Sequence, residues 1–349
     1  MKADLLSRLT IVIPTYKRPL KALRAMRFWA NQRVKVLVLD GCDDAMDLPD
    51  DIREAQNIEY FHKPIALSER LAFAASYVTS DYVALCGDDD FHLPSSLIAA
   101  IRFLDDHPDY VACGGQMLGF TEPKFFRAMA FEKYELFESL DFCQNDPRER
   151  AMAYFQNYTP ATIYGVCRKD VWCEGMLLWG KNEFPVYVIG ELQFEFNAIY
   201  RGKVKRLPVL QWLRSAKLGH GDVHSRRQGK DRSLSKAIRI EKHWHDQSES
   251  GLKMQILDYT SSEISEHTGL PASTIAHDLE SALSLYVERR RKLKFVSRNN
   301  IFSMLAAKLR KRVNRLKLPI KFRLAFLKRR GVSFNESEVM DIWRRINGA

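Results

Sequence analysis

Short apolar runs alternate with helically spaced apolar residues along the first third of the chain. The runs cover 9–14, 34–39, 58–61, 82–86 and 110–113, and the helical spacing covers 20–30, 67–78 and the stretch that opens at Pro94. Continuous apolar runs are typical of strands buried on both faces. Strands separated by helices of this length predict right-handed crossovers. The pattern therefore predicts an α/β fold with a mostly parallel sheet flanked by helices.

Polar residues follow three of these predicted strands at the point where each strand ends. Pro14, Thr15 and Tyr16 follow the first strand, Asp40 follows the second, and an acidic run follows the strand at 82–86. In open parallel sheets, ligands bind beyond the carboxyl ends of the strands. We therefore expect these residues to lie along one edge of the sheet.

The acidic run consists of Asp88, Asp89 and Asp90, and Pro94 begins the next predicted helix. Three carboxylates at the end of a buried strand repel one another unless a cation compensates them. Mg²⁺ and Mn²⁺ prefer carboxylate oxygens and usually bind through one or two carboxylates together with substrate phosphates. The pattern favours a metal–phosphate site, and the alternative is a solvated acidic loop that caps the following helix.

Three segments in this order, IVIPTYKRP, VLVLDGCDD and YVALCGDDDFHLP, resemble glycosyltransferase family 2 of the GT-A fold, in particular its bacterial cell-surface polysaccharide type. The resemblance extends over residues 8–215. It implies transfer of a sugar from a nucleotide-diphosphate sugar to a hydroxyl acceptor, with Mn²⁺ or Mg²⁺ as cofactor and inversion at the anomeric carbon. The acceptor would be a glycan or a lipid-linked glycan.

The resemblance also assigns roles to residues on the donor side. The loop containing Pro14, Thr15, Tyr16 and Arg18 would hold the base and ribose, and Asp40 would recognise the base. Arg70 would face the diphosphate, unless it forms an ion pair with a neighbouring acid. The family's Asp-x-Asp-Asp metal pattern reads Gly87-Asp88-Asp89-Asp90 here. All three carboxylates are therefore candidate metal ligands, and Asp88 is also a candidate contact with the nucleotide-sugar.

The acceptor side requires one carboxylate that takes the proton of the attacking hydroxyl. Glu191 stands at the start of a predicted helix, where the resemblance places this acid, and Glu195 lies one turn further on the same face. The alternative for Glu191 is an acid that only favours the helix dipole. Relatives often place an Arg and a His after the strand at 204–212, which makes Arg214, His220 and His224 candidates for closing over diphosphate or metal. That strand contains Pro208, which predicts an edge position.

Charge separates the C-terminal part from the rest. The chain of 349 residues carries a net charge of +11, yet residues 286–330 hold seventeen Lys and Arg against the single acid Glu288. We predict a catalytic domain over 1–228 and a helical region over 229–349. Apolar residues at helical spacing within the basic segment (Ile301, Leu305, Leu309, Val313 and Leu316, resumed by Ile320, Leu324 and Leu327) suit an anionic membrane surface. The alternative is a basic helix docked on the catalytic domain.

Two other functions are alternatives to glycosyl transfer. The stretch 264–283 resembles a helix-turn-helix, but its second helix begins without the basic or amide side chains that read DNA, so an ordinary helical hairpin is favoured and nucleic acid is not an expected partner. A nucleotidyltransferase would need a glycine-rich phosphate loop after the first strand, where Pro14-Thr15-Tyr16 stands. No signal peptide or membrane span is apparent. We therefore expect a cytoplasmic protein, peripheral on the inner face of the plasma membrane.

Overall fold

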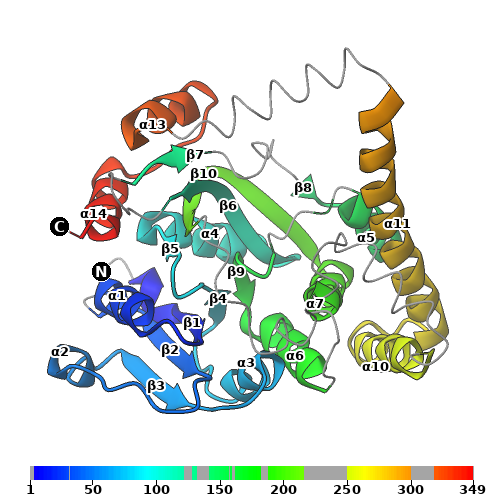
Figure 1. The fold of residues 1–349 in the computed structure, drawn as a ribbon. Helices are drawn as coiled ribbons and strands as arrows, with labels where there is room; N and C mark the ends of the chain where they lie inside the picture. Colours follow the sequence, from blue (N-terminus) through cyan, green and yellow to red (C-terminus); the bar gives the residue numbers. More distant parts are fainter. Residues whose placement is uncertain are drawn as a thin grey trace.

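The chain forms an α/β structure in which helices lie on both faces of a curled sheet (Figure 1). The computed structural model describes residues 4–30, 32–121, 128–131, 141–156, 158, 162–181, 188–215, 250–299 and 318–348. The predicted α/β class, with its mostly parallel sheet and flanking helices, is confirmed.

The described strands form one ten-stranded sheet. In chain order they are β1 (Leu9–Thr15), β2 (Lys35–Asp40), β3 (Ile58–His62), β4 (Tyr82–Leu85), β5 (Phe91–His92), β6 (Tyr110–Phe120), β7 (Ala130–Phe131), β8 (Asp141–Phe142), β9 (Val166–Arg168) and β10 (Lys203–Ser215). The order across the sheet is β3-β2-β1-β4-β9-β6-β10-β5, with β7 paired to β6 and β8 to β10.

The helices cover the two faces of this sheet. In chain order they are α1 (Pro19–Trp29), α2 (Asp50–Arg53), α3 (Leu67–Ala75), α4 (Pro94–Asp106), α5 (Pro147–Gln156), α6 (Lys169–Gly180), α7 (Val188–Arg201), α10 (Ser250–Thr268), α11 (Ala272–Asn299), α13 (Ile320–Arg329) and α14 (Glu336–Ile346).

The long strand pairings are parallel. β1 pairs in parallel with β2 and β4, β2 with β3, and β10 with β6, whereas each antiparallel pairing joins only two residue pairs. The register sets Thr15 opposite Asp40 and Val12 opposite Leu85. The ends of β1, β2 and β4 therefore lie next to one another, as the strand pattern predicted.

The prediction that the strand with Pro208 lies at the edge of the sheet is wrong. β10 pairs with β6 along its length and with β8 and β5 near its two ends. The register with β6 shifts between Arg206 and Leu210, so the proline lies where the regular ladder is interrupted. Ser333 compensates there, because its N–H donates to the Pro208 carbonyl at 2.9 Å and its own carbonyl accepts from the Leu210 N–H at 2.8 Å.

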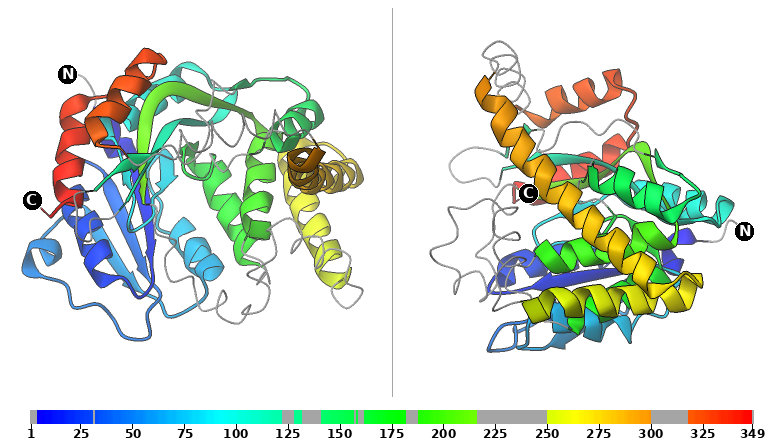
Figure 2. Two further views of the ribbon diagram at one scale, coloured as in Figure 1. Left: turned by 45° about the horizontal axis from the view of Figure 1, so that its top comes forward. Right: turned by 90° about the vertical axis from the view of Figure 1, so that its right-hand side faces the viewer.

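Alternate residues of the central strands point into two separate cores. Val12, Leu37 and Leu85 face a core shared with α3, α6, α7, α10 and α11. Ile11 and Val36 face the other core, shared with α1, α4, α13 and α14. The left panel of Figure 2 shows the sheet between these two groups of helices.

The C-terminal helices therefore belong to both cores. In the stretch that resembles a helix-turn-helix, Ile264, Ile275 and Leu279 are buried, which agrees with the predicted helical hairpin. In the basic segment, Ile320, Leu324 and Leu327 are buried against the sheet, so this part of the expected membrane-facing stripe packs on protein. The stripe over 301–316 and the predicted boundary at 228 lie outside the described residues, and the division into two domains stays a prediction.

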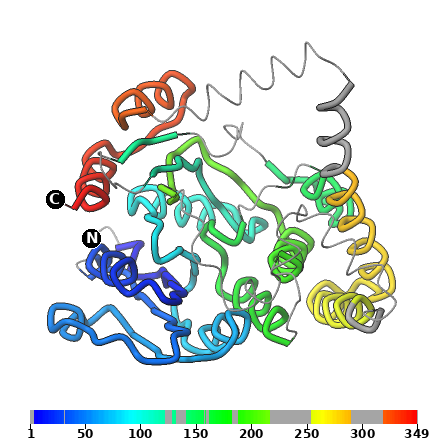
Figure 3. The backbone as a smooth tube through the Cα atoms, in the orientation of Figure 1, coloured from blue at the N-terminus to red at the C-terminus, as the bar shows by residue number. Residues whose placement is uncertain are grey.

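The two ends of the described chain lie together. The guanidinium of Arg345 in α14 lies 5.8 Å from the ring centre of Phe28 in α1, and Figure 3 shows the two helices side by side. Within the described part of the chain, no helix combines the length and the apolar character needed to cross a bilayer.

Candidate active site

Two of the three consecutive carboxylates lie at the junction of β1, β4 and α1. The Thr15 hydroxyl donates to Asp88 Oδ2 at 2.8 Å. Arg18 bridges the acids, with 2.6 Å from Nη2 to Asp88 Oδ1 and 3.0 Å from Nη1 to Asp89 Oδ2. Lys21 Nζ lies 2.8 Å from Asp89 Oδ2. Two cations from the start of α1 therefore balance the two carboxylates.

Lys21 was not among the residues predicted from the sequence. It lies three positions after Arg18 on the first turn of α1, and residues at this spacing share one face of a helix. That spacing is the signal that would have identified it. The turn into α1 passes through Lys17, whose φ of 54° is in the left-handed region, and this backbone reversal precedes the arginine that reaches the acids.

Asp88 is almost fully buried, with 1% of its surface exposed. Burial raises the pKa of its carboxyl to about 6, and the positive charge of Arg18 opposes that shift. Asp88 Oδ1 accepts no hydrogen bond and has only the ion pair with Arg18. A buried carboxylate oxygen that accepts no hydrogen bond and has one ion pair can bind a further cation.

Asp90 has a different hydrogen-bond partner from the other two acids. Its Oδ1 accepts a hydrogen bond from the Ser215 N–H at 2.8 Å, which fixes the end of β10. Asp88, Asp89 and Asp90 do not form a set of three converging ligands. The carboxylate oxygens of Asp88 and Asp89 fit a hard divalent cation. Two carboxylate ligands leave the other coordination positions to substrate phosphates and water.

Asp40 and Arg70 are buried at the ends of β1 and β2 and form hydrogen bonds there. Asp40 is fully buried and accepts hydrogen bonds from the Tyr60 hydroxyl at 2.7 Å and the Cys42 N–H at 3.0 Å. Burial alone would raise the pKa of Asp40, but these hydrogen bonds outweigh it and lower the pKa. Arg70 Nη1 donates to the carbonyl oxygens of Thr15 at 2.7 Å and Leu39 at 3.0 Å. With 2% of its surface exposed, Arg70 holds the ends of β1 and β2 together.

Glu191 lies in the first turn of α7 with 5% of its surface exposed. The Tyr158 hydroxyl donates to Glu191 Oε1 at 2.6 Å. Tyr158 in turn packs on Tyr286 of α11, with ring centres 5.0 Å apart. No sequence signal points to Tyr158, because the contact depends on how a loop, α7 and α11 pack together.

Glu195, the alternative base, lies inside the core with none of its surface exposed. The Tyr154 hydroxyl donates to its carboxylate, and the Ile163 N–H donates to Oε1 at 3.2 Å. Burial raises the pKa of Glu195 to about 7. Its complete burial makes Glu195 the less accessible of the two acids.

The pKa of Glu195 predicts a pH-dependent stability. Its pKa rises from the model-compound value of 4.5 to about 7 on folding, so the folded chain binds this proton more tightly than the unfolded chain. Stability should therefore fall as pH rises from about 4.5 to about 7, by about 3 kcal/mol. In urea unfolding at several pH values, Glu195→Gln should flatten this dependence. An unchanged slope in the variant would contradict the assignment.

Gly190 precedes Glu191 and lies against the indole of Trp179. A methyl group on Gly190 would lie 1.9 Å from Trp179 Nε1. We therefore expect Gly190→Ala to destabilise the fold by roughly 1–3 kcal/mol, measured as a lower melting temperature. The double variant with Trp179→Leu should lose less than the sum of the single effects, because the smaller side chain removes the clash. Additive losses would show that the two residues do not compete for this space.

Arg214 lies at the end of β10, next to the residue that holds Asp90. Its guanidinium stacks over Trp212 at 4.7 Å and over Tyr164 at 5.3 Å from the ring centres. These aromatic contacts hold the Arg214 guanidinium next to Ser215, the residue that bonds to Asp90. His220 and His224 lie outside the described residues.

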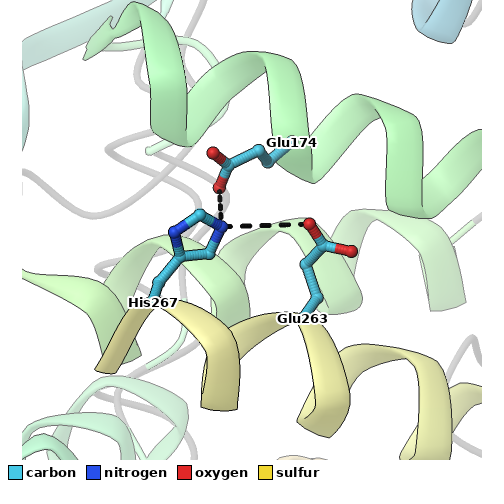
Figure 4. Close-up of side chains that lie close together, drawn as sticks. All are labelled: Glu174, Glu263 and His267. Carbon is cyan, nitrogen blue, oxygen red and sulfur yellow. Dashed lines mark ion pairs between the residues drawn. The ribbon is translucent and has the colours of Figure 1, made fainter. Parts of the chain in front are cut away.

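A second group of metal-capable side chains lies away from this site. Within the described ranges, Glu174, Glu263 and His267 are the residues whose ligand atoms converge (Figure 4). His267 Nε2 lies 3.0 Å from Glu174 Oε2 and 3.9 Å from Glu263 Oε1. Arg201 pairs with Glu174, and Lys181 Nζ lies 3.4 Å from Glu263 Oε2. The contacts of His267 with Glu174 and Glu263 connect α6 to α10.

One protein-family model matches the N-terminal part of the chain. Residues 10–164 match the family model of glycosyl transferase family 2. No curated protein matches the chain.

Several solved structures resemble the chain at low identity. The crystal structure of S. aureus TarS 1-349 is 13% identical, with coverage of 84% of this chain and 93% of that one and a TM-score of 0.43. The same fragment in complex with UDP-GlcNAc is 14% identical, with coverage of 82% and 91% and a TM-score of 0.42. Its complex with UDP is 12% identical, with coverage of 84% and 93% and a TM-score of 0.41.

Proposed function

We propose that this chain, a glycosyltransferase whose residues 10–164 belong to glycosyl transferase family 2, moves a sugar from a nucleotide-diphosphate sugar to a hydroxyl acceptor, with metal dependence and inversion. The observation that carries the proposal is the group of Thr15, Arg18 and Lys21 around Asp88 and Asp89 at the ends of parallel strands. This edge is where open α/β sheets bind nucleotides.

The donor side combines acids for a metal with cations for a diphosphate. Asp88 and Asp89 would hold Mg²⁺ or Mn²⁺, which when bound neutralises charge on the leaving diphosphate. Arg18 and Lys21 are half-buried, and Arg18 lies beside both acids and Lys21 beside Asp89, so each is within reach of an anionic group bound there. The loop at Pro14, Thr15 and Tyr16 would contact the base and ribose.

Asp40, Arg70 and Arg214 have different places in this proposal. Both oxygens of Asp40 are already hydrogen-bonded, so base recognition through Asp40 would add to an existing network. Arg70 bonds to strand-end carbonyls, which supports a positioning role under the donor loop. Arg214, stacked on aromatic rings beside the acidic loop, is the better candidate for a contact with the diphosphate.

Glu191 would act as the general base. A single displacement with inversion needs a carboxylate that accepts the proton of the acceptor hydroxyl as its oxygen attacks the anomeric carbon. Tyr158 donates to one oxygen of Glu191, which orients the carboxylate and leaves its other oxygen for the acceptor. With inversion, the diphosphate would depart on the face opposite the attacking hydroxyl, and Arg18 and Lys21 would stabilise its charge.

The proposal extends to the acceptor and its location. The basic segment 286–330 supports peripheral binding to an anionic membrane surface, on its cytoplasmic face, where a lipid-linked glycan would be presented. Such an acceptor suits polysaccharide assembly. The buried hairpin of α10 and α11 gives no support to DNA reading by this stretch.

The decisive experiment is a thermal-shift screen of UDP-, GDP-, dTDP- and CMP-sugars with and without Mn²⁺. A donor present at a hundred times its Kd should stabilise the folded chain by about 2.7 kcal/mol. We expect one base to give a shift that requires Mn²⁺. If no nucleotide shifts the melting temperature while DNA does so at low salt, the glycosyltransferase proposal is wrong.

A further inference from the structure

Helix α13 is apolar on two opposite faces. Its inner face packs Ile320, Leu324 and Leu327 into the core that also contains Ile11 and Val36. Its outer face presents two phenylalanines one helical turn apart, Phe322 with 67% and Phe326 with 40% of its surface exposed. Packing of the core therefore does not explain why the outer face carries two phenylalanines.

Cationic side chains neighbour these two phenylalanines along the sequence of α13 and just after it. Lys321, Lys328, Arg329 and Arg330 are all exposed. The Arg330 guanidinium lies over the Phe326 ring at 5.5 Å from its centre. Lys328 pairs with Glu336 at 2.9 Å, which leaves the face with a clear positive excess.

The outer face of α13 is fixed relative to the catalytic sheet. Just before the helix, Leu318 and Ala130 exchange two backbone hydrogen bonds of 2.9 and 2.8 Å. Together with the buried inner face, these bonds hold the helix on the strand pair β6–β7 in one orientation (Figure 1). Whatever binds Phe322 and Phe326 therefore orients the whole domain.

We propose that the outer face of α13, defined by Phe322, Phe326 and the neighbouring cations, is the surface through which the protein contacts an anionic lipid bilayer. Aromatic rings flanked by Lys and Arg suit the boundary between headgroups and acyl chains. Each cation near an anionic surface adds attraction that falls off within a Debye length. A single-stranded nucleic acid would also stack on aromatic rings, but such sites line a charged groove, whereas the two rings project from the outer side of a helix.

The inference rests on the membrane association in the proposed function and specifies the contact that would produce it. It differs from the prediction made from the sequence, which placed Ile320, Leu324 and Leu327 on the membrane side. The structure buries those three residues and exposes the phenylalanines on the other side of the same helix. It requires neither a particular donor nor a particular acceptor.

Vesicle flotation of the full-length chain tests this proposal. The vesicles contain either phosphatidylcholine alone or an equal mixture with phosphatidylglycerol, at low and at high salt. We compare the wild type with Phe322→Ser/Phe326→Ser and with a control, Met254→Ser/Tyr259→Ser, whose side chains on α10 are 54% and 43% exposed. We expect the wild type and the control to float with anionic vesicles at low salt, and the phenylalanine variant to bind at least about tenfold more weakly.

A second measurement reports the contact directly. Phe322→Trp places an indole at the proposed contact, so brominated lipids should quench more fluorescence in this variant than in the wild type. Nucleotide binding by thermal shift should be unchanged in all variants, because the outer face lies apart from the donor site. An unchanged shift also shows that a variant is folded.

The outcomes separate this inference from the proposed function. If the wild type does not float, membrane association itself is wrong and the inference fails with it. If the wild type and the phenylalanine variant float equally, another part of the chain binds lipid and the role of α13 is wrong. If the phenylalanine variant loses affinity for a single-stranded oligonucleotide but not for vesicles, the face binds nucleic acid and the inference is overturned.

Discussion

Glu191→Gln should lower sugar transfer by roughly 10²–10⁴-fold, the range expected when a general base is lost. The amide keeps the shape of the side chain and can still accept the Tyr158 hydroxyl hydrogen bond seen at 2.6 Å. Donor affinity should be unchanged, because the cations and acids that surround the proposed donor site are unaltered. Steady-state rates with saturating donor, together with donor titration by thermal shift, measure both effects.

Glu195→Gln provides the matched control one helical turn away. Glu195 is fully buried and bonded to Tyr154 and Ile163, so its variant should change stability with pH but retain transfer. Tyr158→Phe should lower transfer less than Glu191→Gln, since the base remains but loses the contact that orients it. An active Glu191→Gln together with an inactive, folded Glu195→Gln would move the base to Glu195.

Asp89→Asn should abolish metal-dependent donor binding and lower turnover on the order of 10³-fold. The reason is that the metal contributes several kcal/mol of charge stabilisation, and one of its two expected carboxylates is removed. The fold should persist, because Asp89 lies at a strand-end loop and its partners Arg18 and Lys21 are partly solvated. Mn²⁺-dependent thermal shift and turnover measure the loss.

Asp51→Asn is the control for this charge change. Asp51 is an exposed acid that is also ion-paired, at 2.8 Å from Arg27, and it lies in α2, outside the proposed site. Its variant should behave as wild type, since exposed ion pairs contribute little. Full donor turnover in Asp89→Asn would remove that acid from the metal site and leave Asp88 as the one candidate of the pair.

Local patterns along the chain predicted the strands that form the site. The apolar runs and their polar ends sufficed to bring Thr15 and Asp88 together, because parallel strands of similar length end at one edge. The same reasoning could not separate Asp90 from Asp88 and Asp89. Asp90 is directed by the Ser215 N–H, which comes from a strand more than a hundred residues later in the chain.

The contacts of Arg70 and Tyr158 could not be predicted from the sequence, for two different reasons. The spacing that marked Arg70 as a diphosphate contact could not reveal that its guanidinium reaches the carbonyls of Thr15 and Leu39. Tyr158 carried no pattern at all, yet it holds the candidate base. In both cases the environment of a polar side chain depends on groups that only the tertiary structure brings near.

Helix α13 shows that amphipathic spacing identifies an apolar face without identifying its partner. Ile320, Leu324 and Leu327 repeat at helical spacing and would suit a lipid surface or a protein core equally well. The structure places them in the core. The sequence pattern did not reveal the second apolar face, because its two phenylalanines are interspersed with charged residues.

The order in which the chain is synthesised matters for a fold in which α14 completes the core around β1. Trp343 and Ile346 pack in the same core as Leu9 and Ile11, and the Glu338 carboxylate accepts from the Ser95 hydroxyl at 2.7 Å at the start of α4. These contacts connect residues more than two hundred positions apart, and such long-range closure is slow. Until α14 has been synthesised, this core of the nascent chain is incomplete, and we expect chaperone dependence and aggregation to be most severe in chains cut short before α14.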